Sequence, residues 1–319
     1  MVPPMVLGGA APPASACWGG RARGGVRGGA CALALPAGGP CVRRRQARLG
    51  LQGKPVLGRA RSGVTWGRDR RGASSLAVRD AAGEGGGEVA FPDSGGAQVA
   101  SFFKPPAREN FKGKKQGVVV LSDVYGFRTE NVRSTADFLA DKGYHVLVPD
   151  MFQMRPWPPG KPMEEGFETW KARYAGPPER ALAVVAGAGE FLRKGGCTEV
   201  AVLGFGFGGG QAVQAMSTDA AGRYNAGGAF YPTRFLPQEM GRIGAPLMVT
   251  FADQDPLVPA EMRWAVSDAM SVMKVPNKIN VYVGRGHGFA HMPRRDNAVE
   301  LEDAGNAMEE MFFFFSQHL

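Results

Sequence analysis

Apolar residues along this chain gather in short runs that end at glycine, proline or aspartate. Uninterrupted runs are typical of strands buried on both faces of a sheet, because a half-exposed strand alternates apolar and polar positions. Between the runs, apolar residues recur at helical spacing, as in the segment that ends at Gly143. The pattern predicts strands over 117–121, 144–148, 198–203, 226–231, 246–251 and 278–283, and helices over 129–142, 178–194, 209–216, 259–273 and 295–317.

The alternation of strands and helices predicts a parallel sheet with helices on both faces. Ahead of it, the strand-like runs 88–91 and 98–103 flank an Asp-Ser-Gly-Gly turn, which predicts a β-hairpin. We therefore expect the α/β class, with a doubly wound, mostly parallel sheet and an N-terminal β-hairpin, as a single domain over 86–319. Within it, the segment 151–177 is rich in proline, tryptophan and methionine, and we expect a loop or lid beside a pocket.

Charge is distributed unevenly along the 319 residues. Residues 1–80 carry thirteen Arg, one Lys and two Asp, a net charge of +12, so the formal total of +9 leaves −3 for residues 81–319. An Arg-rich, acid-poor segment without apolar periodicity is typical of an organelle transit peptide. We expect residues 1–85 to be a disordered basic leader that directs the protein to a plastid. The mitochondrion or the cytoplasm, or a basic arm that stays attached, are the alternatives.

The segment after the leader carries no sequence signal for nucleic acid, a membrane or a cofactor. Its net charge is slightly negative, and no apolar run reaches the length of a membrane-spanning helix. Cys197 is its only cysteine, so no internal disulfide is expected. Gly204-x-Gly206-x-x-Gly209 fits the dinucleotide fingerprint, but it lies in a late strand–helix unit and lacks the acid that such a site needs. The sequence leaves the oligomeric state open.

Several residues with useful chemistry lie just beyond the ends of predicted strands. In a doubly wound sheet, ligands bind at the carboxyl ends of the strands. Asp123, Gly206, Asp255 and His287 each follow a different strand. Gly206 is the centre of a Gly-x-Gly-x-Gly turn between strand and helix, which is the pattern of the nucleophile elbow in α/β-hydrolases. An elbow, then an acid, then a histidine is also the chain order of the catalytic triad in that fold.

Five ordered motifs resemble the dienelactone hydrolase family of carboxymethylenebutenolidase-like proteins. They are Asp123-x-Tyr125-Gly126, Gly143-Tyr144 with Val148-Pro149-Asp150, Gly204-Phe205-x-Phe207-Gly208-Gly209, Asp255-Pro256-x-Val258-Pro259 and Gly286-His287-Gly288-Phe289. The resemblance runs from the hairpin at residue 88 to near the C-terminus. It implies an α/β-hydrolase fold and a Cys-His-Asp triad that opens lactones and cleaves small-molecule esters, with no cofactor.

The same resemblance implies a role for each of these residues. His287 would be the general base, and Asp255 would orient its imidazole. The backbone N–H groups of Phe207 and Val124 would form the oxyanion hole. Asp123 would match an acidic residue, often Glu in the family, that helps to manage the protonation of the thiol.

The chain departs from the family where the attacking atom should be. Gly206 stands in the position of the nucleophilic cysteine and has no side chain to react. Cys197 precedes its strand, near the opposite end, and Ser122 is not on the elbow, so neither replaces the missing thiol. Two hypotheses stay open. One is a weak hydrolase in which His287 activates a water molecule; the other is a non-catalytic small-molecule-binding or interaction protein on a hydrolase fold.

Two further groups have simple explanations beside the functional ones. His287 and His291 are four residues apart, but the glycine and proline around them predict a loop, so no metal site is expected. Trp157, Trp170 and Tyr174 either line a substrate pocket or pack the segment in which they lie.

Overall fold

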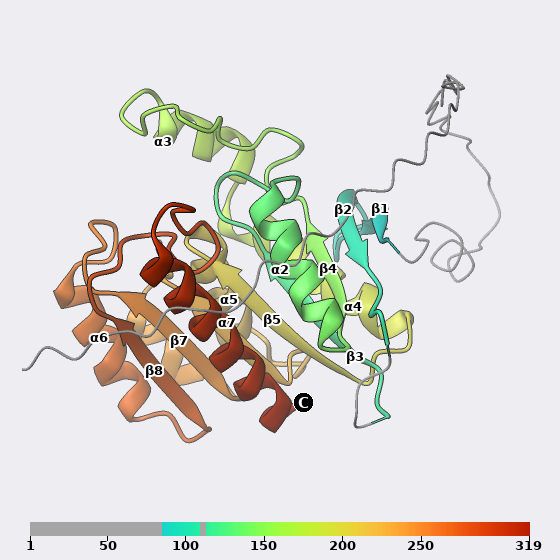
Figure 1. Cartoon of the computed structure of the whole chain (residues 1–319). Coiled ribbons are helices and arrows are strands. Elements are labelled where there is room, and N and C mark those ends of the chain that lie inside the picture. Colours follow the sequence, from blue (N-terminus) through green and yellow to red (C-terminus); the bar gives the residue numbers. More distant parts are fainter. Residues whose placement is uncertain (1–84, 109–112) are drawn as a thin grey trace, which may run out of the picture. The chain divides into compact units, whose positions relative to one another are not determined.

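The computed structural model describes residues 85–108 and 113–319, which build an eight-stranded sheet in the order β1-β2-β4-β3-β5-β6-β7-β8 (Figure 1). β2 pairs antiparallel with both β1 and β4, and every other neighbouring pair is parallel. The expected α/β class, with a mostly parallel sheet and an N-terminal hairpin, is confirmed. The strands are β1 (Gly87–Pro92), β2 (Gln98–Lys104), β3 (Gln116–Leu121), β4 (His145–Pro149), β5 (Glu199–Phe205), β6 (Ala226–Phe230), β7 (Leu247–Ala252) and β8 (Asn277–Tyr282).

The expected leader over 1–85 lies outside the described residues, apart from Gly85. The same holds for Cys17, Cys31 and Cys41, so Cys197 is the one cysteine in the part of the chain that the structure covers.

Strands in the middle of the sheet are buried because helices cover both of its faces. β3, β6 and β7 are buried at every position, which explains their uninterrupted apolar runs. In Figure 1, α2 and α7 lie on one face of the sheet and α4 and α5 on the other. β8 is one of the two edge strands, and its residues are half-buried or exposed. The helices are α2 (Glu130–Asp141), α3 (Phe167–Trp170), α4 (Pro178–Lys194), α5 (Phe207–Ser217), α6 (Ala260–Ser271) and α7 (Ala298–His318), with a short π-helix over Lys171–Ala175 and a 3-10 helix over Pro237–Arg242.

Two helices begin two or more residues away from the expected start. α5 begins at Phe207 and not at 209, and the glycines of its first turn are needed for close packing. A Cβ at Gly208 would lie 2.4 Å from the carbonyl oxygens of Leu121 and Ser122. α7 begins three residues later than expected, at Ala298, where the side chain of Asn297 accepts a hydrogen bond from the Glu300 N–H at 3.1 Å and caps the helix.

The segment 151–177 projects from the sheet and carries α3 (Figure 1). Its large aromatic side chains pack on one another: the Trp157 ring centroid lies 5.6 Å from that of Trp170 and 5.3 Å from that of Phe167. Both indole N–H groups donate to backbone carbonyls within the segment. Of the two explanations for Trp157 and Trp170, the structure favours packing, since both side chains are buried.

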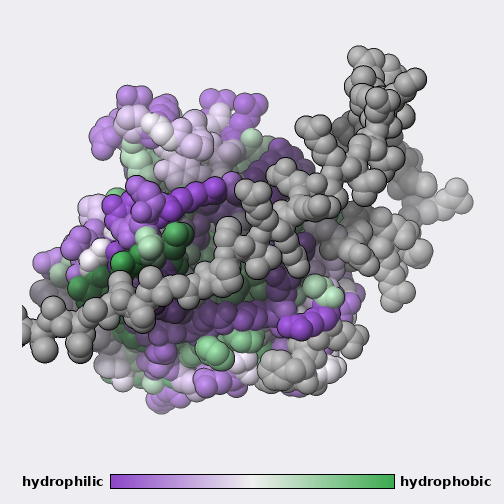
Figure 2. Space-filling model, viewed as in Figure 1, coloured by the Kyte–Doolittle hydropathy of each residue, from purple (hydrophilic) through white to green (hydrophobic). Residues whose placement is uncertain are grey.

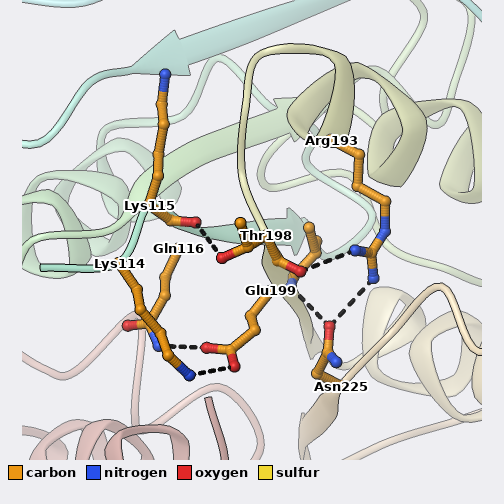
Figure 3. Close-up of polar contacts among 8 residues, drawn as sticks. Lys114, Lys115, Gln116, Arg193, Thr198, Glu199 and Asn225 are labelled. Carbon is orange, nitrogen blue, oxygen red and sulfur yellow. Dashed lines mark hydrogen bonds and ion pairs between the residues drawn. The ribbon is translucent and has the colours of Figure 1, made fainter. Parts of the chain in front are cut away.

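A polar network joins the strand starts at the edge of the sheet opposite the candidate site (Figure 3). The Glu199 carboxylate, at the start of β5, accepts hydrogen bonds from Lys114 at 2.6 Å and from Gln116 at 2.8 Å. The side-chain oxygen of Asn225, just before β6, accepts hydrogen bonds from the Arg193 guanidinium and from the backbone N–H of Val200 in β5. These contacts fix the register of β3, β5 and β6 at the end where the strands begin.

The surface seen in Figure 2 is mostly hydrophilic, and apolar residues gather over the region of β8 and α7. Exposed apolar side chains in these elements and beside them are Val281, Val283, Val299, Leu301 and Phe313. Within residues 85–108 and 113–319, no helix is long and apolar enough to cross a bilayer.

Candidate active site

The turn between β5 and α5 holds Gly206 in a conformation that side chains rarely adopt. Its φ is +52° and its ψ is −112°, in the left-handed half of conformational space that favours glycine. The Gly206 N–H donates to the Phe230 carbonyl at 3.0 Å, and its own carbonyl accepts from the N–H of Thr233 at 3.0 Å. The last residue of β6 and the segment just after it therefore hold both backbone polar groups of Gly206, and the turn has the strand-to-helix form of a nucleophile elbow.

His287 and Asp255 form a hydrogen-bonded pair at the ends of β8 and β7. The His287 Nδ1 atom lies 2.7 Å from Oδ2 of Asp255, whose side chain is fully buried, whereas 23% of the His287 side chain is exposed. The second oxygen of Asp255 accepts the Leu257 N–H at 2.8 Å. A carboxylate on this side places the imidazole proton on Nδ1, so Nε2 is left as an acceptor that can take a proton.

The free nitrogen of His287 faces Gly206. A Cβ built on Gly206 would lie 3.0 Å from Nε2 and 3.5 Å from Cε1 of His287, with the Asp123 Cβ at 3.8 Å. The structure thus brings together the elbow, the base, its acid and Asp123. The position that a nucleophilic side chain would fill, within bonding reach of the imidazole, carries no side chain.

Phe207 and Val124 offer backbone N–H groups beside the elbow. Phe207 is the first residue of α5, where N–H groups have no partner inside the helix and the helix dipole favours negative charge. Within residues 85–108 and 113–319, neither N–H donates a hydrogen bond. Unpaired N–H donors are the groups that stabilise an oxyanion in acyl transfer.

Asp123 takes part in a second chain of hydrogen bonds that sequence reasoning missed. One oxygen of its carboxylate accepts the Tyr125 N–H at 2.9 Å, and the other lies 2.9 Å from Nε2 of His291. Nδ1 of His291 lies 2.5 Å from the hydroxyl of Tyr231. Burial, reinforced by the charge of Asp123, raises the pKa of Tyr231 well above its usual value, so the phenol stays protonated. Both oxygens of Asp123 are therefore occupied by groups other than the elbow.

A signal for two of these residues was present in the sequence. Tyr231 directly follows β6, and His291 lies in the loop after β8, so both are at carboxyl ends of strands, where sites are expected.

Neither alternative nucleophile is exposed to solvent. Cys197 precedes β5 at the opposite edge of the sheet, and burial raises the pKa of its thiol to about 11. Ser122 is fully buried. In the described part of the chain, no group of three His, Cys, Asp or Glu side chains is placed to hold a metal ion.

A side chain at position 206 should cost stability. For Gly206→Ala we expect a loss of about 1–3 kcal/mol in the free energy of unfolding, because alanine is strained at this φ and its Cβ would press on His287. Urea unfolding measures the change. Gly305→Ala in α7 is the control: nothing lies within 4 Å of its Cβ position, so we expect about 0.5–1 kcal/mol of stabilisation. An unchanged Gly206→Ala midpoint would show that the turn is not strained.

Comparison with known proteins gives matches in both sequence and fold. A sequence model of the dienelactone hydrolase family matches residues 102–319. The chain is 30% identical over 185 residues to the hydrolase tropI of Talaromyces stipitatus, a match that covers 56% of this chain and 72% of that protein. It is 28% identical over 185 residues to the carboxymethylenebutenolidase homolog of Mus musculus, covering 57% and 73% of the two chains. In fold it resembles the dienelactone hydrolase of Anabaena variabilis, with a TM-score of 0.51, 15% identity, and coverage of 73% of this chain and 99% of that one.

Proposed function

The chain belongs to the dienelactone hydrolase family, and on that premise we propose that it hydrolyses ester or lactone bonds with a water molecule as the nucleophile. The family supports a hydrolase of small molecules. The water follows from Gly206, which leaves the elbow without an attacking side chain.

One observation carries this proposal: His287 Nε2 lies 3.0 Å from the position that a Cβ on Gly206 would occupy. A water molecule in place of the absent thiol would lie within hydrogen-bond reach of the His287 imidazole, whose Nδ1 is held by Asp255. That is the geometry of a general base for water.

The reaction then follows in two steps. His287 Nε2 takes a proton from water while the water oxygen bonds to the substrate carbonyl carbon, and the carbonyl oxygen becomes an oxyanion held by the N–H groups of Phe207 and Val124. The tetrahedral species collapses, the carbon–oxygen bond of the leaving group breaks, and the imidazolium returns its proton to the leaving oxygen. An ester yields an acid and an alcohol, and a lactone yields a hydroxy acid. Asp255 stabilises the imidazolium throughout.

The expected rate is modest. General-base catalysis contributes about 10²–10⁴-fold, and an oxyanion hole with binding alone retains about 10³–10⁴ over water. A full catalytic triad gives a larger rate enhancement than either contribution, because a positioned covalent nucleophile divides the reaction into two easier steps.

The same glycine supports a second candidate, a non-catalytic binder of small molecules. A protein that binds a small molecule without cleaving it needs the assembled site but not the nucleophile, and this chain has that combination. Turnover separates the two candidates.

For the full chain with aryl esters and simple lactones, we expect slow steady hydrolysis without a burst and without a covalent acyl adduct in the intact mass. The reason is that no side chain at the elbow can be acylated. An adduct on any residue would contradict the water mechanism and identify the true nucleophile. No turnover above background, together with calorimetric binding of a lactone, would support the binder.

A further inference from the structure

Asp123, His291 and Tyr231 connect three different strand ends through consecutive hydrogen bonds. Asp123 follows β3, Tyr231 follows β6, and His291 lies in the loop after β8 that also carries His287. The side chains of Asp123 and His291 are at most a tenth exposed, and Tyr231 is fully buried. Burial of a carboxylate costs free energy unless the group is paired. The hydrogen bonds among Asp123, His291 and Tyr231 are therefore a fixed part of the site.

Tyr231 also holds an unusual backbone conformation. Its φ is +36°, which is strained for a residue with a side chain, and its N–H donates to the Thr250 carbonyl at 2.6 Å. The residue before it, Phe230, accepts the N–H of Gly206, and Thr233, two residues after it, donates to the Gly206 carbonyl. The bend at Tyr231 therefore sets the position of the two groups that hold the elbow.

Tyr231 contacts the base as well as the elbow segment. Its ring centroid lies 4.8 Å from that of His287 at an angle of 57°. His291 in turn stacks on Phe205, the last residue of β5, with ring centroids 4.5 Å apart. The elbow and the imidazole are therefore both packed against members of the same hydrogen-bonded chain.

We propose that Asp123, His291 and Tyr231 are positioning residues, which hold the Gly206 turn and the His287 imidazole at the spacing that hydrolysis requires. The Tyr231 hydroxyl donates to Nδ1 of His291, and the Nε2–H of His291 donates to Asp123. This gives Asp123 a role other than the management of a thiol. The inference rests on the proposed function for its kinetic consequence but not for its geometry.

Tyr231→Phe tests the proposal, because it removes the hydroxyl and keeps the ring. On ester substrates we expect kcat to fall about 10-fold or more with KM nearly unchanged, because small misplacements of reacting groups are costly. The matched control is Tyr224→Phe. Tyr224 is also buried, and its hydroxyl donates to the Val185 carbonyl at 2.5 Å, away from the site, so kcat should stay as in the wild type. An equal loss of kcat in both variants would reduce Tyr231 to a structural role.

A second readout does not depend on turnover. In a Gly206→Cys background, the introduced thiol reacts with iodoacetamide at a rate set by its thiolate fraction, and therefore by the placement of His287. Peptide mass spectrometry follows position 206 separately from the native cysteines. We expect Tyr231→Phe to slow this alkylation about 10-fold, and Tyr224→Phe to leave it unchanged. Equal rates with and without Tyr231→Phe would overturn the proposal even if the wild type hydrolyses nothing.

Two further measurements keep the proposal falsifiable if Tyr231→Phe does not fold. Asp123→Asn removes the acceptor at the other end of the same hydrogen-bonded residues and should slow alkylation about as much as Tyr231→Phe is expected to; an unchanged rate would contradict the proposal. Histidine ¹⁵N NMR of the wild type is simple because the chain has only four histidines. It should show His291 with its proton on Nε2, and a proton on Nδ1 would contradict the assigned hydrogen bonds.

Discussion

Gly206→Cys is expected to raise ester hydrolysis by about 10²–10³-fold. A triad nucleophile is worth about 10⁶ in kcat, and the remainder of such a site retains about 10³–10⁴ over water. The substitution places a Cβ 3.0 Å from Nε2 of His287 and 3.8 Å from the Asp123 Cβ. The thiol would therefore lie close to both His287 and Asp123. Initial rates on an aryl ester measure the gain, and an acyl adduct at position 206 in the intact mass should accompany it.

The gain is opposed by strain, which makes the control essential. The imidazole must shift by a few tenths of an ångström to accept the new Cβ, and the backbone keeps its unfavourable φ. Gly206→Ala carries the same strain without the thiol, so it should show no gain and no adduct. A folded Gly206→Cys protein with wild-type rates would mean that the base, the oxyanion donors or the substrate site no longer serve acyl transfer.

The position of the candidate site followed from the sequence because topology places strand ends together. Gly206, Asp255 and His287 each lie just beyond a strand of one parallel sheet, and parallel strands share the edge at which they end. Their order along the chain then restricts the arrangement further. The fold class was predictable for the same reason: apolar runs and the helices between them leave few ways to cover a parallel sheet.

The second hydrogen-bonded chain could not be derived in this way. Whether Asp123 faces the elbow or His291 depends on side-chain directions in loops, where no periodicity applies. Nothing about a tyrosine in the sequence predicts the positive φ of Tyr231. Such a strained conformation persists only where the surrounding structure enforces it. Trp157 and Trp170 posed a similar problem, because aromatic side chains serve pockets and packing equally well, and only the contacts decided for packing.

His287→Gln is expected to lower ester hydrolysis by about 10²–10⁴-fold, which is the contribution of a general base. Glutamine fills much of the same space but cannot take a proton from water, so the step that activates the nucleophile is lost. Asp255→Asn should lose a large part of the same activity, because an amide does not stabilise the imidazolium that forms after proton transfer. Initial rates at saturating substrate, corrected for the background reaction, measure both losses.

Turnover and lactone binding, measured on the same variants, separate a hydrolase from a binder. His318→Gln, in the last turn of α7, is the matched control and should keep the wild-type rate, since His318 contacts Phe314 and lies outside the site. If the protein is a hydrolase, His287→Gln lowers turnover to the predicted extent while calorimetry still detects lactone binding of similar affinity. If the wild type and His287→Gln release product equally slowly and bind lactone equally well, His287 is not a base. The paired geometry of His287 and Asp255 would then serve recognition alone.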